Sequence, residues 1–361
     1  MSEPTDGAAD AVSMEELRLA TRNHGMPLEA LRYDVTPVGL HYLLIHYDIP
    51  VIDPSEWRLK VDGQVDLSLE LSLEDLRALP ATTKAVTMEC AGNGRALLSP
   101  RPPSQPWLLE AVGTGRWTGV ALAHVLADAG LRPDAAVVVF TGADRGIEGG
   151  IEQAYQRSLP VETAMASGAL LAYELNGAPL PPQHGFPLRL VVPGWYGMTN
   201  VKWLSTITVS DTQFEGYQQS YAYKLRQHED DAGVPVTRMV PRSLMVPPGI
   251  PDFFTRARTL TAGECELTGR AWSGQAPVAL VEVSTDGGVT WDQAMLDQVE
   301  DPDRDSGAWQ GWRYPWRAEP GQHELCCRVT DAAGNRQPDH PEWNLSGYTN
   351  NAVHRVTVTV T

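Results

Sequence analysis

The residues from 85 to 95 constrain this chain more than any other stretch, because they join an apolar run to a cysteine and a tight turn. Residues 85–88 predict a buried β-strand, and the run stops just before Cys90. Residues 92–94, with the sequence Gly-Asn-Gly, tolerate left-handed backbone. A strand that ends in this way holds one thiol at a fixed point above a sheet, and Arg95 can place a permanent positive charge beside it. The pattern indicates a metal-thiolate or nucleophile site next to an anion site.

The alternative is that Cys90 is a buried structural cysteine before an ordinary turn, since free cysteines are mostly buried and inert. The four cysteines are too few and too badly spaced for a disulfide scaffold or a zinc site; they are Cys90, Cys265, Cys326 and Cys327. The adjacent Cys326 and Cys327 would point to opposite faces of a strand, so we expect this pair to be small core residues.

The net charge limits the classes of partner. The chain has 361 residues and a formal net charge of −17, with 42% hydrophobic and 20% charged residues. This composition is that of a globular protein, and the length favours two domains. Nucleic acid is excluded as a partner because phosphate binding needs a basic surface. Any site for a small anion must therefore be a local cluster of Arg and Lys within an acidic protein.

Targeting and membrane signals are missing. The chain has no apolar run of about 18 residues, so we expect no membrane-spanning helix. Residues 1–12 are acidic and rich in small residues, with neither a basic start nor an apolar stretch. We therefore expect a disordered tail, no export signal and a cytoplasmic location.

Periodicity predicts a mixed first domain over residues 13–235. Ser13 followed by Glu16 has capping-box spacing and starts a helix that ends near Ala20. A hairpin is predicted over residues 57–71, a short helix after Ser72, and strands at 135–141, 170–176, 188–192 and 204–209. Short helices and long loops between the strands favour an α+β domain, and no Gly-x-Gly-x-x-Gly follows a strand, so a dinucleotide site is unsupported.

The glycine-rich residues 113–116 are a second candidate for anion binding. They precede an apolar run over residues 120–129 that predicts a helix capped by Thr118. A glycine loop that enters a helix N-terminus offers backbone N–H groups to a phosphate, and Arg116 would add a positive charge. By itself this signal is weak, because such loops are common.

A second domain is predicted over residues 236–361. Residues 233–251 are rich in proline and glycine, which marks the boundary. A hairpin with a strong turn signal follows at 279–291, and residues 323–330 and 353–360 alternate apolar and polar side chains. Short strands at regular spacing predict an all-β, immunoglobulin-like sandwich.

Six short motifs follow one another between about residues 20 and 225. They are Arg-Asn-His at 22–24 followed by Pro27, Cys-Ala-Gly-Asn-x-Arg at 90–95, Trp107 with Gly-Thr-Gly-Arg-Trp at 113–117, His-Gly-Phe-Pro-Leu-Arg at 184–189 with Val-Val-Pro-Gly at 191–194, Val-Lys-Trp-Leu at 201–204, and Tyr-Lys at 223–224. In this order the motifs resemble the sulfite oxidase family of molybdopterin-dependent oxidoreductases. The resemblance implies a molybdopterin-binding domain followed by an immunoglobulin-like dimerisation domain, and hence a homodimer.

The resemblance also assigns roles to individual residues. It makes Cys90 the thiolate ligand of a molybdenum atom, which a pterin dithiolene also holds. Two arginines would bind the substrate anion, Trp107 would wall its pocket and Tyr223 would donate a hydrogen bond; the arginines are Arg22 and Arg95. The residues implied to bind the cofactor are Asn23, His24, Arg116, His184, Arg189 and Lys202.

The implied reaction is oxygen-atom transfer that oxidises sulfite to sulfate, with electrons passed to a separate acceptor such as a cytochrome c. Neither His-Pro-Gly-Gly nor Cys-x-x-Cys-His occurs, so we expect no haem in this chain. The family's sulfite-oxidising members carry an arginine in a Trp-Asn-x-Arg-Gly segment, where this chain has Ser346. One cation fewer favours, as an alternative, another sulfur or nitrogen oxo-substrate, with sulfoxide or nitrate reduction as examples. A non-enzymatic binding module is the third hypothesis.

Overall fold

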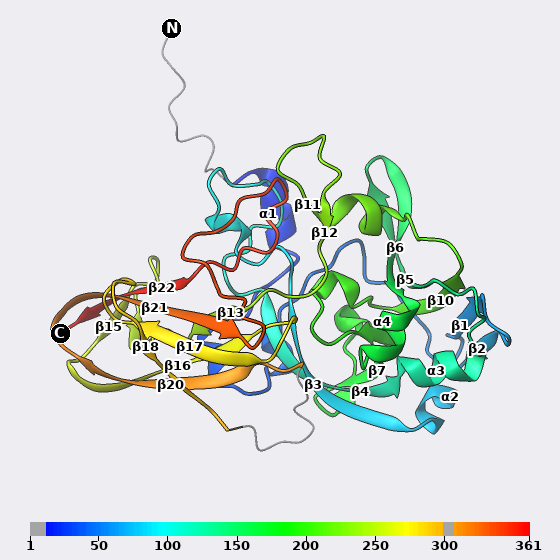
Figure 1. The fold of residues 1–361 in the computed structure, drawn as a ribbon. Coiled ribbons are helices and arrows are strands. Elements are labelled where there is room, and N and C mark those ends of the chain that lie inside the picture. The colour runs from blue at the N-terminus through cyan, green and yellow to red at the C-terminus, as the bar shows by residue number, and fades with distance from the viewer. Residues whose placement is uncertain (1–11, 299–306) are drawn as a thin grey trace, which may run out of the picture.

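The computed structural model describes residues 12–298 and 307–361. They form two lobes that lie side by side (Figure 1), a mixed lobe of helices and strands and an all-β lobe that contains the C-terminus. The tail predicted over residues 1–12 lies outside the described residues except for Val12. Both fold classes predicted from the sequence, α+β and then all-β, are confirmed.

Two sheets build the mixed lobe. The first has the strand order β2-β1-β10-β5-β6, and β1 pairs antiparallel with β2 but parallel with β10. The second has the order β3-β4-β7-β8, with β9 also paired to β7. The strands are β1 (Leu59–Gly63), β2 (Leu69–Leu71), β3 (Ala81–Glu89), β4 (Val112–Ala121), β5 (Val137–Glu148), β6 (Ile151–Pro160), β7 (Leu170–Leu175), β8 (Ala178–Pro179), β9 (Arg189–Val191) and β10 (Leu204–Ser210).

Short helices complete this lobe. The α-helices are α1 (Met14–Ala20), α2 (Leu73–Ala78), α3 (Leu122–Ala129) and α4 (Val161–Ala166). The 3₁₀ turns are η1 (Leu28–Arg32), η2 (Val38–Leu40), η3 (Arg95–Leu97), η4 (Pro182–His184) and η5 (Gly197–Thr199), and η6 (Gln218–Ala222) is a π-helix. The predicted capping box is confirmed, since Ser13 Oγ accepts from the Glu16 N–H at 3.1 Å and Glu16 Oε2 accepts from the Ser13 N–H at 2.9 Å. Among the residues that the structure describes, no helix reaches the length and apolarity that crossing a bilayer needs.

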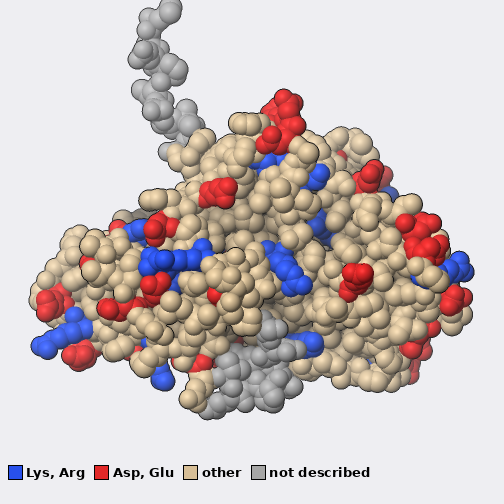
Figure 2. All heavy atoms as spheres, viewed as in Figure 1, with Lys and Arg blue, Asp and Glu red and all other residues tan. Residues whose placement is uncertain are grey.

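The all-β lobe is a sandwich. Its sheets have the orders β13-β16-β20-β19 and β14-β15-β22-β21-β17-β18, and side chains from both form one buried core. The strands are β13 (Arg242–Met245), β14 (Ile250–Pro251), β15 (Arg258–Leu260), β16 (Gly263–Trp272), β17 (Val278–Ser284), β18 (Asp292–Gln293), β19 (Met295–Leu296), β20 (Gln310–Ala318), β21 (Gly321–Asp331) and β22 (His354–Val360). The ribbon of β11 (Lys224–Leu225) and β12 (Val234–Pro235) precedes it. Figure 2 shows acidic and basic side chains interspersed on one face of the molecule, without a basic stripe.

The prediction of a glycine loop at residues 113–116 is wrong. These residues lie inside β4, antiparallel to β3, and α3 begins only at Leu122 without a side-chain cap. The glycines serve close packing between strands. A Cβ atom at Gly115, for example, would lie 2.6 Å from Cδ1 of Leu175 on β7. Thr118, the predicted helix cap, is a strand residue whose hydroxyl lies 2.8 Å from that of Thr83.

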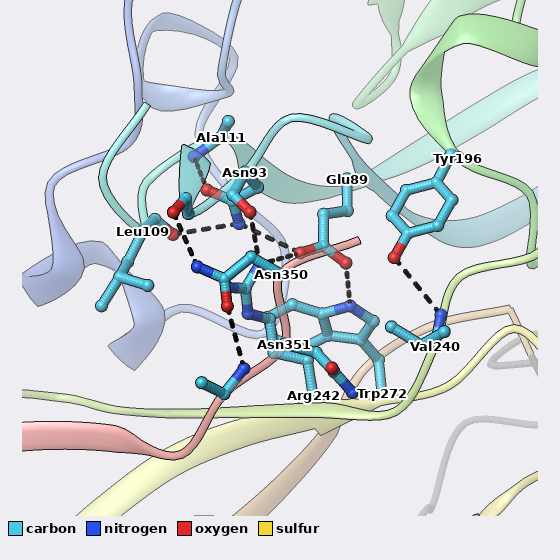
Figure 3. Close-up of polar contacts among 12 residues, drawn as sticks. Glu89, Asn93, Leu109, Ala111, Tyr196, Val240, Arg242, Trp272, Asn350 and Asn351 are labelled. Atoms are coloured by element: carbon cyan, nitrogen blue, oxygen red, sulfur yellow. Dashed lines mark hydrogen bonds and ion pairs between the residues drawn. The ribbon is translucent and has the colours of Figure 1, made fainter. Parts of the chain in front are cut away.

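A buried ion pair joins the two lobes directly beside Cys90. Glu89, the last residue of β3, contacts Arg242 at the start of β13, and both side chains are 2% exposed. Glu89 Oε2 also accepts from Trp272 Nε1 at 2.9 Å, and Oε1 accepts from Asn93 Nδ2 at 3.1 Å (Figure 3). An apolar cluster with residues from both lobes surrounds the pair. The position of Cys90 therefore depends on the contact between the lobes.

Replacing Glu89 by Gln should lower the urea midpoint of unfolding, because the Arg242 charge would stay buried without its carboxylate. Removing one partner of a buried pair costs roughly 3–5 kcal/mol. The control is Glu152→Gln, which removes a carboxylate that is 65% exposed and paired with Arg145 at 2.9 Å. Exposed pairs contribute about 0–1 kcal/mol, so its midpoint should stay close to that of the wild type. Equal midpoints for the two variants would contradict the role of the ion pair.

Candidate active site

The turn after β3 fixes the Cys90 thiol through backbone hydrogen bonds. The Cys90 N–H donates to the Ala111 carbonyl oxygen at 2.9 Å, and the Asn93 N–H donates to the Cys90 carbonyl oxygen at 2.9 Å. The Asn93 side chain closes the turn, since its Oδ1 accepts from the Ala111 N–H at 3.1 Å. Cys90 is 9% exposed and therefore has little freedom to move. The strand, turn and thiol arrangement predicted from the sequence is confirmed.

Arg95 folds back over this turn, and a side chain at Gly92 would displace its guanidinium. A Cβ atom at Gly92 would lie 2.6 Å from Nη2 of Arg95. The guanidinium is held by two carbonyl oxygens, with Nε donating to Ser346 at 2.7 Å and Nη1 to Gln105 at 3.2 Å. Within the described residues no carboxylate is recorded in an ion pair with it. Its positive charge is therefore available to an anion beside Cys90.

The environment of Cys90 suits a metal ligand better than a free nucleophile. Burial raises the pKa of the thiol, and the Arg95 charge only partly opposes this effect. A metal ion overcomes such a penalty because a coordinated thiol is deprotonated outright. No group of three or more His, Cys, Asp or Glu residues that could hold a metal occurs in the described part of the chain. A metal at Cys90 would therefore have to bring further ligands of its own.

Cys90 lies where two cavities meet. The inner cavity has about 680 Å³ of space including its mouth, and the outer cavity has about 880 Å³. Both are lined by Leu44, His46, Cys90 and Tyr223. The inner cavity is further lined by Asp144, His184, Arg189, Asn200 and Lys202. The outer cavity is further lined by Arg22, Arg95, Trp107, Glu148 and Tyr348.

The inner cavity is lined by two cations with neutral hydrogen-bond partners, the buried Arg189 and the half-buried Lys202. Arg189 donates to the carbonyl oxygens of His184 and Asn200, each at 3.1 Å, and lies 4.8 Å from the Trp117 ring centroid. Burial lowers the pKa of Arg189 to about 10. Lys202 Nζ donates to the Leu44 carbonyl oxygen at 2.7 Å.

The charges around Lys202 make the inner cavity suited to an anion. Burial and the Arg189 charge lower the pKa of Lys202 to about 7, against the opposing effect of Asp144. Burial and the same cations lower the pKa of His184 to about 2, so this histidine is neutral. Burial also raises the pKa of Asp144 to about 6, which weakens its ability to neutralise the cations. A bound anion would supply the missing charge, so these residues fit the phosphate of the molybdopterin that the resemblance implies.

The outer cavity brings together the predicted catalytic residues. Arg22, Arg95, Trp107 and Tyr223 all line it together with Cys90. Arg22 Nη2 donates to the His46 carbonyl oxygen at 3.3 Å, so its guanidinium is tethered by a neutral group. Burial raises the pKa of Tyr223 well above its ordinary value, so its hydroxyl stays protonated and can donate a hydrogen bond.

Three residues predicted to bind the cofactor line neither cavity. Asn23 is buried and structural, since its Nδ2 donates to Gln105 Oε1 at 2.8 Å and its Oδ1 accepts from the Ile45 N–H at 2.7 Å. His24 is exposed, although its charge lowers the pKa of His184. Arg116 is exposed on β4 opposite Ala85, several residues before Cys90. Arg116 therefore does not lie in a glycine loop at a helix N-terminus, as the sequence had predicted.

Other segments contribute polar residues to the cavities that no sequence motif indicated. Asp144 and Glu148 come from β5, and Tyr348 comes from the second lobe. His46 follows η2, and Gln218 begins the π-helix η6. Each stands alone in the sequence without a motif. A π-helix is often associated with a functional site, but its irregular hydrogen bonding leaves no pattern in the residue types.

Comparison with known proteins covers both lobes. Residues 46–218 match the oxidoreductase molybdopterin binding domain, and residues 243–361 match the Mo-co oxidoreductase dimerisation domain. The mitochondrial sulfite oxidase of Homo sapiens is 38% identical over 341 residues, which are 90% of this chain and 62% of that protein. The chain thus spans less than two thirds of the length of this relative. The nitrate reductase [NAD(P)H] of Hordeum vulgare is 33% identical over 352 residues, which are 90% of this chain and 39% of that protein.

A solved structure supports the fold. The crystal structure of the sulfane dehydrogenase SoxCD from Paracoccus pantotrophus aligns with a TM-score of 0.79 and covers 100% of this chain and 95% of that chain. At 24% identity, this similarity shows the fold alone. The sulfite oxidase of Gallus gallus is 36% identical over 336 residues, which are 89% of this chain and 72% of that protein. Because this match extends through both lobes, we conclude that the chain belongs to the sulfite oxidase family of molybdenum oxidoreductases.

Proposed function

We propose that this protein oxidises sulfite to sulfate at a molybdenum–molybdopterin cofactor ligated by Cys90. The observation that carries the proposal is the meeting of two cavities at one buried thiol. The inner cavity holds cations with neutral partners, as a phosphate-bearing cofactor requires, and the outer cavity holds two further arginines, as a small dianion requires. When bound, the cofactor supplies oxygen-atom transfer and a two-electron oxidation.

The residues of the outer cavity bind and orient the substrate. Arg95 is fixed by two carbonyl oxygens and presents its charge beside Cys90. Arg22 is exposed and loosely tethered, so it can close on an anion that enters from solvent. Trp107 is buried and walls the pocket, and the protonated Tyr223 hydroxyl donates a hydrogen bond to the bound oxyanion. The bound cofactor would supply electrons one at a time to an external acceptor such as a cytochrome c. The second domain would pair two copies of the chain.

Nitrate or sulfoxide reduction with the same cofactor is the second candidate function. Ser346 favours it, because a serine replaces the cation expected for sulfite binding, and its carbonyl oxygen holds Arg95. A monoanion or a neutral sulfoxide needs fewer positive charges than sulfite does. The similarity to a plant nitrate reductase also supports this candidate.

Replacing Cys90 by Ser should strongly reduce both bound molybdenum and sulfite-dependent reduction of ferricyanide, because a hard hydroxyl is a poor substitute for the soft thiolate. Metal content is measured by mass spectrometry on protein from a host that makes the cofactor. Cys265→Ser is the matched control, since this cysteine is half-buried in the second lobe. Wild type without molybdenum, or equal metal content and turnover in Cys90→Ser and wild type, would contradict the proposal.

Replacing Ser346 by Arg should lower the KM for sulfite, because it adds a cation beside the pocket that Arg95 lines. A gain of one charge-assisted hydrogen bond, about 1.5–3 kcal/mol, corresponds to roughly a tenfold or larger effect. Ser346→Gln controls for side-chain length without charge. An unchanged or raised KM in Ser346→Arg, with intact metal content, would count against sulfite as the substrate.

A further inference from the structure

Oxidation of sulfite to sulfate releases protons as well as electrons. The balanced half-reaction is SO₃²⁻ + H₂O → SO₄²⁻ + 2H⁺ + 2e⁻, and the electrons pass to the external one-electron acceptor. The O–H bonds of the water break, so a base beside the outer cavity must receive the protons. The inference that follows rests on the proposed function and asks which group of this chain is that base.

Most residues of the outer cavity cannot accept a proton. Arg22 and Arg95 are permanently protonated. Burial raises the pKa values of Tyr47, Tyr223 and Tyr348, so all three already carry their protons. Among the described residues that line this cavity, and with Cys90 reserved for the metal, two ordinary bases are left, His46 and Glu148.

These two bases are in direct contact and come from separate segments. His46 Nε2 lies 2.9 Å from Glu148 Oε2, and the side chains are 23% and 32% exposed. Glu148 Oε2 also accepts from the Tyr47 hydroxyl at 3.0 Å and from Gln218 Nε2 at 2.6 Å. Burial alone would raise the pKa of Glu148, but the hydrogen bonds from His46, Gln218 and Tyr47 outweigh it and the pKa lies below its ordinary value. Glu148 is therefore an anion that can stabilise a protonated His46.

A buried oxygen beside the pair provides a place for water. Gln218 is 1% exposed, and its Oε1 has no hydrogen-bond partner among the described residues. Buried polar atoms of this kind are usually satisfied, often by a water molecule. The amide nitrogen of the same side chain lies 3.2 Å from His46 Nε2. A water at Gln218 would thus adjoin the pair.

The other charged and titratable groups around the pair do not replace it. Tyr155 packs against His46 with the ring centroids 5.1 Å apart, and burial raises its pKa, so it stays protonated. Asp144 lies in the inner cavity near Lys202 and does not line the outer cavity. Arg22 donates to the His46 carbonyl oxygen, and Asp48, Tyr217 and Tyr348 are the other titratable groups near the pair or Asp144.

We propose that His46 is the proton acceptor of the outer cavity and that Glu148 positions it and passes its protons to solvent. With Nε2 donating to Glu148, the neutral imidazole has a lone pair on Nδ1 to receive the first proton. His46 then passes its Nε2 proton to Glu148, which is partly exposed and releases it to solvent, and the freed Nε2 lone pair receives the second proton. General base catalysis of this kind contributes about 10²–10⁴-fold to a rate.

The test uses His46→Ala and Glu148→Gln, with Glu152→Gln as the control on the neighbouring strand. Each protein is checked for molybdenum, and kcat and KM for sulfite are measured against pH with ferricyanide. His46→Ala should lose about 10²–10⁴-fold in kcat, with little change in KM and without the acid limb of the wild-type profile. Added imidazole should restore activity. Glu148→Gln should move the acid limb to lower pH, because the imidazolium loses its carboxylate.

Metal-loaded His46→Ala that keeps the wild-type kcat and acid limb, or a loss that imidazole does not restore, would overturn the assignment and leave the proposed function intact. Wild type that holds molybdenum but does not oxidise sulfite would instead overturn the proposed function. The same variants are then assayed for nitrate reduction with a reduced dye, a reaction that consumes two protons. An unchanged rate in His46→Ala would overturn the assignment there too, and an imidazole-sensitive loss would support it.

Discussion

The buried ion pair between Glu89 and Arg242 is the contact on which the geometry of the site depends. Glu89 is the residue before the metal-ligand candidate Cys90, and Arg242 opens the first strand of the second lobe. Because both side chains are 2% exposed, loss of either partner would leave the other charge buried and uncompensated, which is strongly destabilising. The pair, with Trp272 and Asn93 satisfying the carboxylate, therefore fixes the end of β3 against the sandwich. Residues 243–361 match a dimerisation domain, yet the lobe that they form also helps to fix the position of the Cys90 thiol.

Both lobes also contribute to the outer cavity, where we propose that the substrate binds. Arg95 belongs to the first lobe, but its guanidinium is held by the carbonyl oxygen of Ser346 in the second. Tyr348 from the same segment lines the outer cavity, and the Arg95 guanidinium carbon lies 5.1 Å from its ring centroid. Carbonyl oxygens and aromatic faces position a cation without cancelling its charge as a carboxylate would. This explains how an acidic protein can present a local positive field to an anion.

The two cavities also separate two electrostatic tasks. In the inner cavity the low dielectric makes Arg189 and Lys202 costly to charge, so a phosphate there would be bound strongly. The outer cavity is larger, and Glu148, the one carboxylate among the described residues that line it, is compensated by three donors on a single oxygen. An anionic substrate can therefore enter without meeting an unshielded negative charge. The outer cavity can therefore both bind an anion and receive its protons.

The sequence alone determined the elements whose signals are local. The apolar run before Cys90, the capping box at Ser13 and the alternating strands of the second domain each depend on neighbouring residues, and each was confirmed. The motifs indicated the family, and with it Cys90, Arg95, Arg189 and Lys202. Local reasoning failed at residues 113–116, because glycines that permit close strand packing have the same sequence appearance as a phosphate loop.

Only the tertiary structure decided which isolated polar residues meet. His46, Glu148 and Gln218 are separated by up to 172 positions, and no periodicity links them. Their contact arises because the β5–β6 hairpin, the segment after η2 and the π-helix converge on one cavity. The charge state of Lys202 is likewise a property of its burial, which the residue type does not reveal. Local sequence patterns specify the secondary-structure elements and the motifs. Burial and long-range packing decide which side chains meet and what charge each of them carries.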